Sequence, residues 1–249
     1  MQIIYLYAMK LSEKIRQKIN KLPEGETFGY ADLGIAKTDY QSAAKVMERL
    51  QKKSIIKKTS KGIFYKPEQT KFGELKPNES ELLKPYLFDK GKRIAYITGY
   101  ALYNRLGLTT QMAFRYSIAS RSKRISINRG IIKAKPVKSY AEVTDENYEL
   151  LGFLDAMKDL KKIPDTNTKT CVAILSGKIK KLNTRQANEM VDYALLYPPR
   201  VRALLGAILE QQGRTQKLIK LKASINPLSQ FKLGVTENIL STAPNWNIE

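Results

Sequence analysis

The stretch DYQSAAKVMERLQKKSIIKKTSKGIFYKP, Asp39 to Pro67, decides the fold predicted for the first part of the chain. Its first half has apolar residues at helical spacing, which predicts an amphipathic helix. These residues are Ala43, Val46, Met47 and Leu50. The second half has two β-prone runs, 55–58 and 63–66, and Gly62 between them permits the positive φ of a hairpin turn. The sequence therefore predicts a helix followed directly by a β-hairpin.

Two further helices are expected upstream, at 8–22 and 28–33, which completes a winged helix-turn-helix of about seventy residues. Such a fold places a helix in the major groove of a duplex and its hairpin on the adjacent backbone. The predicted base-reading residues are Tyr40, Gln41, Lys45 and Arg49. Lys37 and Thr38, just before the helix, are also expected to contact DNA. The predicted backbone contacts on the hairpin are Lys57, Lys58, Ser60 and Lys61. The alternative interpretation is a solvated charged face on a protein-interaction domain.

The charge balance of the whole chain favours a polyanionic partner. Among 249 residues, 44 are Lys or Arg and 23 are Asp or Glu, which gives a net charge of +21. The chain has no histidine, so His-based triads, His zinc ligands and His general bases are excluded. Cys171 is the single cysteine, so an intrachain disulfide is excluded and a reducing cytoplasm is the expected setting. We expect no membrane span, because no apolar run approaches roughly twenty residues.

The remainder of the chain predicts an α+β fold with a second, larger domain. A polar segment at 72–80 is interpreted as a linker, so we expect domains at 1–72 and 73–249. Within the second domain, 73–140 is expected to be mixed helix and strand, and 141–249 mainly helical. The expected helices are 81–88, 95–106, 147–161, 184–197 and 200–212, with short strands between 114 and 137.

Two charged groups in the second domain invite a functional interpretation. From Lys90 to Ala141 there are twelve basic residues and no acidic one. Within this segment, a second nucleic-acid surface competes with a solubilising role on an edge strand. That second basic surface consists of Arg121, Lys123, Arg124 and Arg129. Asp155 and Asp159 lie one helical turn apart beside two lysines, and we interpret them as a solvated helix face. We expect no metal and no cofactor.

Three runs of the sequence resemble a known family. They are KGIFYKP at 61–67, GELKPNESEL at 73–82 and TGYALYNRLGLTTQ at 98–111. They look like the signature of AbiEi-type antitoxins of abortive infection, which belong to type IV toxin–antitoxin systems, and the resemblance spans roughly residues 10–213. It implies a winged-helix N-terminal domain that represses its own operon. It also implies a C-terminal antitoxin domain that counteracts a nucleotidyltransferase-like toxin encoded beside it. The Arg-rich segment 114–128 departs from that pattern.

The expected function is therefore a non-enzymatic antitoxin and transcriptional autorepressor, with its own operator duplex and a cognate toxin as partners. Whether the toxin is touched directly is left open. One alternative is a nucleic-acid-modifying enzyme with a winged-helix targeting domain. The missing histidine and the lack of a convergent carboxylate motif count against it. Another is a transcriptional regulator without a toxin partner.

Overall fold

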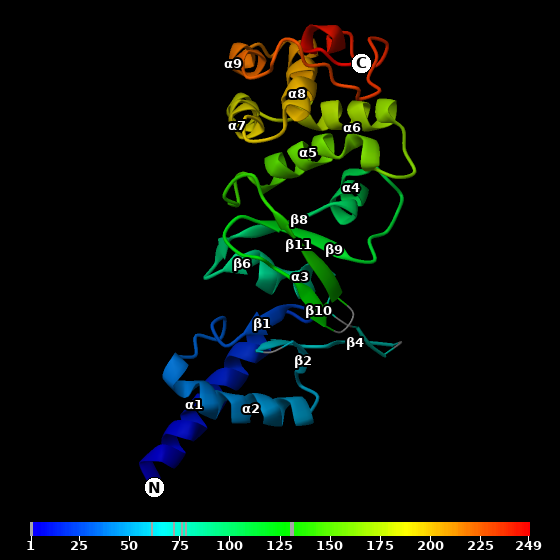
Figure 1. Cartoon of the computed structure of the whole chain (residues 1–249). Coiled ribbons are helices and arrows are strands. Elements are labelled where there is room, and N and C mark those ends of the chain that lie inside the picture. Colours follow the sequence, from blue (N-terminus) through cyan, green and yellow to red (C-terminus); the bar gives the residue numbers. More distant parts are fainter. Residues whose placement is uncertain (1, 61, 72, 76, 78, 130–131) are drawn as a thin grey trace. The chain divides into compact units, whose positions relative to one another are not determined.

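The structure is a computed structural model that describes residues 2–60, 62–71, 73–75, 77, 79–129 and 132–249, without the side chains of 2–9, 79 and 129. It divides into two compact units. Unit 1 comprises residues 1–89 and 129–132, and unit 2 comprises 90–128 and 133–249. Helices and strands both contribute to each unit (Figure 1), so the predicted mixture of helix and sheet is confirmed.

Unit 1 places a small sheet beside two helices. Its helices are α1 (Gln2–Lys21), the 3-10 turn η1 (Lys37–Asp39), α2 (Tyr40–Lys52) and α3 (Glu79–Leu87). Its strands are β1 (Thr27–Gly29), β2 (Lys57–Ser60), β3 (Ile63–Tyr65), β4 (Glu68–Thr70), β5 (Gly73–Leu75) and β6 (Phe88–Asp89). The strand order is β1-β3-β2 and both pairs are antiparallel, while β4 and β5 form a separate pair.

The core of unit 1 follows from the apolar stripes of its two long helices. Ile15 and Ile19 of α1 and the predicted apolar stripe of α2 are buried together with Phe28 and Phe64 of the sheet. Phe28 and Phe64 are direct partners in the β1–β3 register, and their ring centroids lie 6.2 Å apart. This cross-strand contact fixes the hairpin against the helices.

The helix predicted at 28–33 is wrong. Residues 27–29 form strand β1 instead, because Thr27 and Phe28 pair with Tyr65 and Phe64 of β3. The residues that follow are turns, stabilised where the backbone N–H of Gly29 donates to the Asp32 carboxylate at 2.7 Å. Long-range strand pairing has overridden the local helix preference.

Unit 1 continues past the predicted boundary at residue 72. Thr27 donates from its hydroxyl to the carbonyl of Glu81 at 2.8 Å, and its backbone N–H donates to the Glu81 carboxylate at 3.3 Å. Lys84 of α3 also forms an ion pair with Glu26 at 2.9 Å. Helix α3 therefore belongs to the same unit as β1, and unit 1 continues to Asp89.

These contacts lead to a prediction about fragments. A fragment of residues 1–89 is expected to exceed one of residues 1–72 in unfolding free energy by about 1–2 kcal/mol, since the shorter one leaves the Thr27 groups without their partners. Thermal melts followed by circular dichroism would measure the difference, with Thr27→Val in the longer fragment as the control. Equal melting temperatures for the two fragments would contradict this role of α3.

Unit 2 consists of a four-stranded sheet with helices packed on it. Its strands are β7 (Lys92–Arg93), β8 (Ala95–Thr98), β9 (Tyr116–Ser120), β10 (Ile127–Arg129) and β11 (Ile132–Lys138), except that the division assigns Arg129 and Ile132, at the ends of β10 and β11, to unit 1. The sheet order is β10-β11-β9-β8, with β9 parallel to β11 and antiparallel to β8. The helix predicted at 95–106 is wrong in its first half, because Gly99 at φ 69°, ψ −150° separates strand β8 from helix α4 (Tyr100–Leu106).

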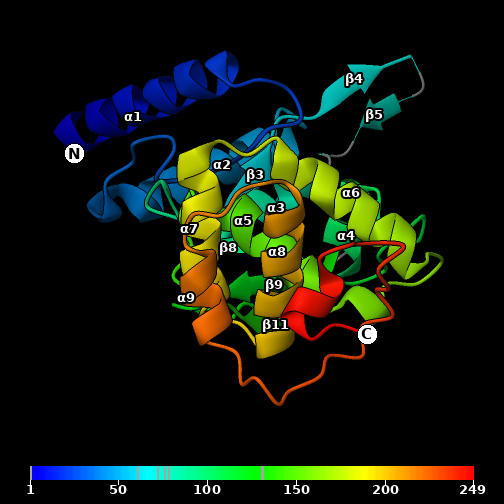
Figure 2. The same ribbon diagram turned by 90° about the horizontal axis from the view of Figure 1, so that it is seen from above.

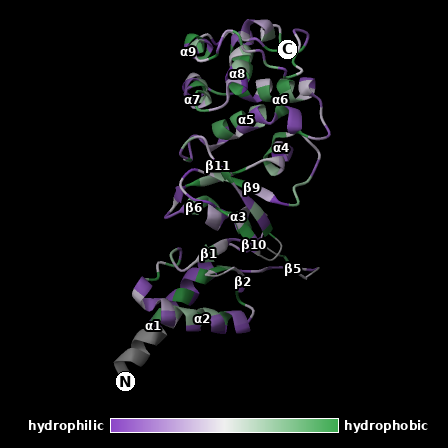
Figure 3. Cartoon of the chain, in the orientation of Figure 1, coloured by the Kyte–Doolittle hydropathy of each residue, from purple (hydrophilic) through white to green (hydrophobic). Residues whose placement is uncertain are grey.

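The helices of unit 2 form its larger core. They are α5 (Tyr148–Lys158), η2 (Leu160–Lys162), α6 (Thr168–Lys180), α7 (Thr184–Ala194), α8 (Pro199–Gln211), α9 (Leu218–Ala223) and η3 (Ala243–Trp246). Helix α5 packs on β8, and α7 and α8 pack on α5. Figure 2 shows α7, α8 and α9 side by side, and Figure 3 shows how hydrophobic α5 and α8 are. Among the described residues, no helix has the length and apolar character needed to cross a membrane.

Candidate nucleic-acid interface

Helix α2 separates its apolar and polar residues onto two faces. The apolar stripe predicted from the sequence is buried in unit 1, whereas Gln41, Lys45 and Arg49 are exposed. These three residues are spaced four apart, so their side chains leave the same side of the helix. Asp39 is the N-cap residue, but its side chain makes no capping hydrogen bond. The exposed side is long enough to enter a major groove.

The charge on this face of α2 remains largely uncompensated. In the described part of the chain, no salt bridge joins Lys37, Lys45 or Arg49 to a carboxylate. The adjacent Glu48 is instead paired with Lys52 at 2.9 Å, and the hydrogen bond from Lys52 lowers the pKa of the Glu48 carboxyl. Three positive charges are thus left for an anionic partner.

Tyr40 and Thr38, which lie near this face in the sequence, differ in how far their side chains are packed against the domain. Thr38 is exposed. The ring of Tyr40 stacks on Tyr30 with centroids 5.0 Å apart, and Tyr30 in turn meets Phe64 edge-on at 5.9 Å. Tyr40 keeps 37% of its surface exposed. The ring of Tyr40 is therefore held against the domain, while part of the residue stays open to solvent.

The hairpin offers fewer backbone contacts than the sequence suggested. Lys58 is exposed and Ser60 is half-buried, but Lys57 forms an ion pair with Glu74 of β5. The hydrogen bond between them lowers the pKa of the Glu74 carboxyl and raises that of the Lys57 ammonium. Lys61 lies outside the described residues. Gly62, at φ +77°, closes the turn as the sequence predicted.

The second basic surface lies in the loop between β9 and β10 and extends into β10. Arg121 is tied down, because it donates to the carbonyl of Tyr140 at 3.1 Å and lies 3.9 Å from the Glu142 carboxylate. Lys123 and Arg124 are exposed. The side chain of Arg129 lies outside the described residues. Arg121, Lys123 and Arg124 are thus the three predicted residues described as exposed side chains, and Arg121 is held by its contacts with Tyr140 and Glu142.

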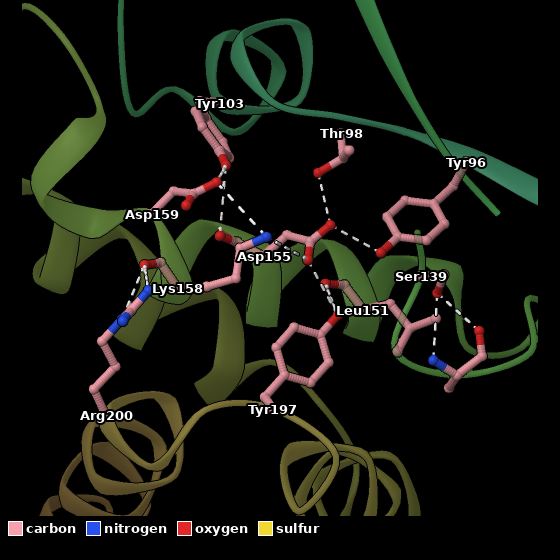
Figure 4. Close-up of polar contacts among 11 residues, drawn as sticks. Tyr96, Thr98, Tyr103, Ser139, Leu151, Asp155, Lys158, Asp159, Tyr197 and Arg200 are labelled. Carbon is pink, nitrogen blue, oxygen red and sulfur yellow. Dashed lines mark hydrogen bonds and ion pairs between the residues drawn. The ribbon is translucent and has the colours of Figure 1, made fainter. Parts of the chain in front are cut away.

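The interpretation of Asp155 as a solvated residue is wrong. Asp155 lies on α5 and is 2% exposed. Its carboxylate accepts hydrogen bonds from Tyr96 at 2.8 Å, Thr98 at 2.6 Å and Tyr197 at 3.2 Å (Figure 4). Lys158 lies 3.6 Å from the same carboxylate. These residues form a buried cluster that joins β8, α5 and the segment between α7 and α8.

The chemistry of this buried cluster is that of a structural network. Burial raises the pKa of Asp155, which the nearby Lys158 and the three hydroxyl donors oppose. Burial also raises the pKa of Tyr96 and Tyr197, which keeps both hydroxyls protonated as donors. Within the described ranges, no group of three acidic, Cys or His side chains is placed to hold a metal ion. No spacing in the sequence indicates the cluster, since its members come from distant segments.

The fold and the site together define an α+β protein of two compact units with a basic helix face on the first. The chain belongs to the Family of unknown function (DUF6088), whose model matches residues 14–191. It is similar in fold to the RV2827C protein from Mycobacterium tuberculosis, known from a crystal structure. The TM-score is 0.54 at 9% sequence identity, over 94% of this chain and 88% of that one. No curated protein matches the chain.

Proposed function

We propose that the protein is a DNA-binding antitoxin that represses its own operon, with unit 1 acting as a winged helix-turn-helix. The observation that carries this proposal is the exposed face of α2, where Gln41, Lys45 and Arg49 leave the helix together. The β1-β3-β2 sheet beside it presents a hairpin with Lys58 exposed. A helix and an adjacent hairpin with this charge suit a duplex.

In this proposal, each part of unit 1 has a separate task on the duplex. Gln41 can bond the edge of adenine and Lys45 that of guanine, because α2 lies in the major groove. In the same proposal, Lys37, just before α2, and Lys58, on the hairpin, contact phosphates, which position the protein without reading sequence. The proposal needs no chemical step, in keeping with the absence of histidine from the sequence.

The antitoxin part of the proposal is supported by the resemblance of 61–67, 73–82 and 98–111 to AbiEi-type antitoxins. We assign that activity to unit 2, against a nucleotidyltransferase-like toxin encoded beside this protein. Expression of the neighbouring gene alone should arrest the growth of the host cells, and co-expression of the full chain should restore it. If that gene is not toxic, or if the full chain fails to restore growth, the protein is a regulator without this role.

The DNA-binding part is tested by titrating the full chain against the duplex upstream of its own gene and a scrambled duplex. The logarithm of the binding constant should fall by about 0.9 per phosphate contact for each tenfold rise in salt. Binding that stays flat between low and physiological salt, or that does not prefer the upstream duplex, would contradict the proposal.

Single substitutions should separate base reading from backbone contact. Gln41→Ala or Lys45→Ala is expected to cost about 1–3 kcal/mol on the operator and much less on scrambled DNA. Lys58→Ala should weaken binding to both duplexes alike. It should also lower the slope of the logarithm of the binding constant against that of the salt concentration by about one. Lys52→Ala is the matched control, because its charge is already paired with Glu48. Operator binding by the Gln41 and Lys45 variants at the wild-type level would show that α2 does not read bases.

A further inference from the structure

Unit 2 has a surface cavity that the proposed function does not use. Its volume is about 830 Å³, and it is lined by the end of β8, helix α4, the loop that follows α4, strands β9 and β11, and the end of α5 with η2. Sites for small organic ligands in proteins fall in this size range. The cavity lies wholly within unit 2 and far along the sequence from the basic face of α2.

One side of the cavity presents large apolar side chains to solvent. Phe114 is 98% exposed, Met112 is 72% exposed and Tyr100 is 48% exposed. Exposed apolar side chains are common singly, but three of them around one cavity mark a binding surface. The loop that holds Phe114 is anchored at its base, because the Asn104 amide donates to the carbonyls of Thr109 and Gln111 at 3.3 and 3.2 Å.

The cavity also carries positive charge without a counter-ion. Arg115, Lys135 and Lys162 line it and are exposed, and none of them makes a salt bridge with a carboxylate in the described part of the chain. Lys158 differs from these three. Its ammonium lies 3.6 Å from Asp155 and 3.8 Å from Asp159 (Figure 4), so its charge is already balanced. The three exposed basic residues are therefore those available to an anion.

We propose that this cavity binds a nucleotide, with the base stacked on Phe114 and the phosphate held by Arg115, Lys135 and Lys162. Proteins bind unpaired nucleotides with an aromatic side chain beside basic groups. Every nucleotide has a base whose face can stack on an aromatic ring and a phosphate that attracts cations. The nucleotide comes either from a single strand of nucleic acid or from the free pool. Both sources share the chemistry that the cavity recognises.

The test uses the full chain and two probes. Binding of a fluorescein-labelled thymidine octamer is measured by anisotropy, and binding of thymidine monophosphate and ATP by calorimetry. Phe114→Ala and Lys135→Ala are the test variants. Leu228→Ala and Lys181→Ala are the matched controls, because they remove an exposed apolar side chain and an exposed charge elsewhere in unit 2. Trp246 fluorescence checks that each variant is folded, since it is the single tryptophan.

We expect Phe114→Ala to weaken octamer binding by about tenfold or more, the loss typical of a removed stacking partner. Lys135→Ala should also weaken octamer binding and should reduce its salt dependence, because it removes a phosphate contact. Each control should leave octamer binding unchanged. Lys45→Ala on α2 should weaken binding to the operator and leave octamer binding unchanged. The two measurements therefore test the cavity and the proposed DNA-binding face separately. Octamer binding without mononucleotide binding identifies the strand as the source, and mononucleotide binding that depends on Phe114 identifies the free nucleotide. The proposal is overturned if no probe binds, or if the test variants bind like the controls.

Discussion

Asp155→Ala is expected to lower the free energy of unfolding of unit 2 by about 3–5 kcal/mol, the loss typical when one partner of a buried charged network is removed. The substitution takes the acceptor from the hydroxyls of Tyr96 and Thr98, which bond it at 2.8 and 2.6 Å. Each buried donor left without an acceptor costs about 1–3 kcal/mol. Tyr197 loses less, because it can still donate to the carbonyl of Leu151 at 3.3 Å. Urea unfolding followed by Trp246 fluorescence reports on unit 2 alone.

Asp155→Asn is the matched control for this substitution. Its remaining oxygen can accept from Tyr96 and Thr98, and its amide can donate to the Tyr197 hydroxyl. We therefore expect a loss of about 1–2 kcal/mol, within the range for a single hydrogen bond. If the Ala and Asn variants are equally stable, the hydrogen bonds of the carboxylate contribute nothing to unit 2.

The pH dependence of the Asn variant provides a second readout. Because burial raises the pKa of Asp155 in the folded state, folding retains a proton that the unfolded chain loses above about pH 4. The part of the stability that depends on this retained proton is thus fully present below the unfolded pKa of Asp155 and is lost as the pH rises through its folded pKa. Asparagine does not titrate, so the stability gap between wild type and Asn variant should narrow as the pH rises.

Gly206→Ala is expected to destabilise unit 2 by about 3 kcal/mol, the upper end of the cost of overpacking a core. Gly206 lies on α8, and a Cβ added there would come within 2.3 Å of the Trp246 indole. The ring cannot easily shift, because it is 3% exposed and its N–H donates to the Glu210 carboxylate. The glycine therefore provides the space in which the C-terminal segment packs on α8.

Gly177→Ala is the matched control, since Gly177 is exposed on α6 and an added Cβ meets nothing within 4 Å. It should stabilise the helix by up to about 1 kcal/mol, because alanine has the higher helix propensity. The double variant Trp246→Leu, Gly206→Ala should lose less unfolding free energy than the two single variants lose together. Urea unfolding followed by circular dichroism would measure these losses. Additive losses would show that Gly206 and Trp246 do not interact.

Short-range sequence patterns correctly predicted the elements that depend on neighbouring residues in the chain. The apolar stripe of α2 is buried as its spacing required, and the hairpin turns at Gly62. The two helix predictions that failed, at 28–33 and in the first half of 95–106, fall on strands whose partners are distant. Phe28 pairs with Phe64, and Ala95 pairs with Ser120. Strand pairing across such separations leaves no signal in a short window of sequence.

The same distinction applies to the candidate site. The exposed polar face of α2 follows from its helical period, so Gln41, Lys45 and Arg49 could be chosen from the sequence. The ion pair of Lys57 with Glu74 could not, because it depends on how β5 lies beside the hairpin. Nor could the buried state of Asp155, since a helical neighbour such as Lys158 gives the same pattern on a solvated surface.

The buried cluster around Asp155 has a consequence for the order of folding events. Its hydrogen bonds join residues 59, 57 and 42 positions apart. Each such bond requires the closure of a long loop, whose entropic cost precedes any gain from the contact. We therefore expect the cluster to form late in folding, after the local elements are in place. Interactions that form late slow unfolding more than they speed folding, so we expect Asp155→Ala to speed the unfolding of unit 2 more than it slows its folding.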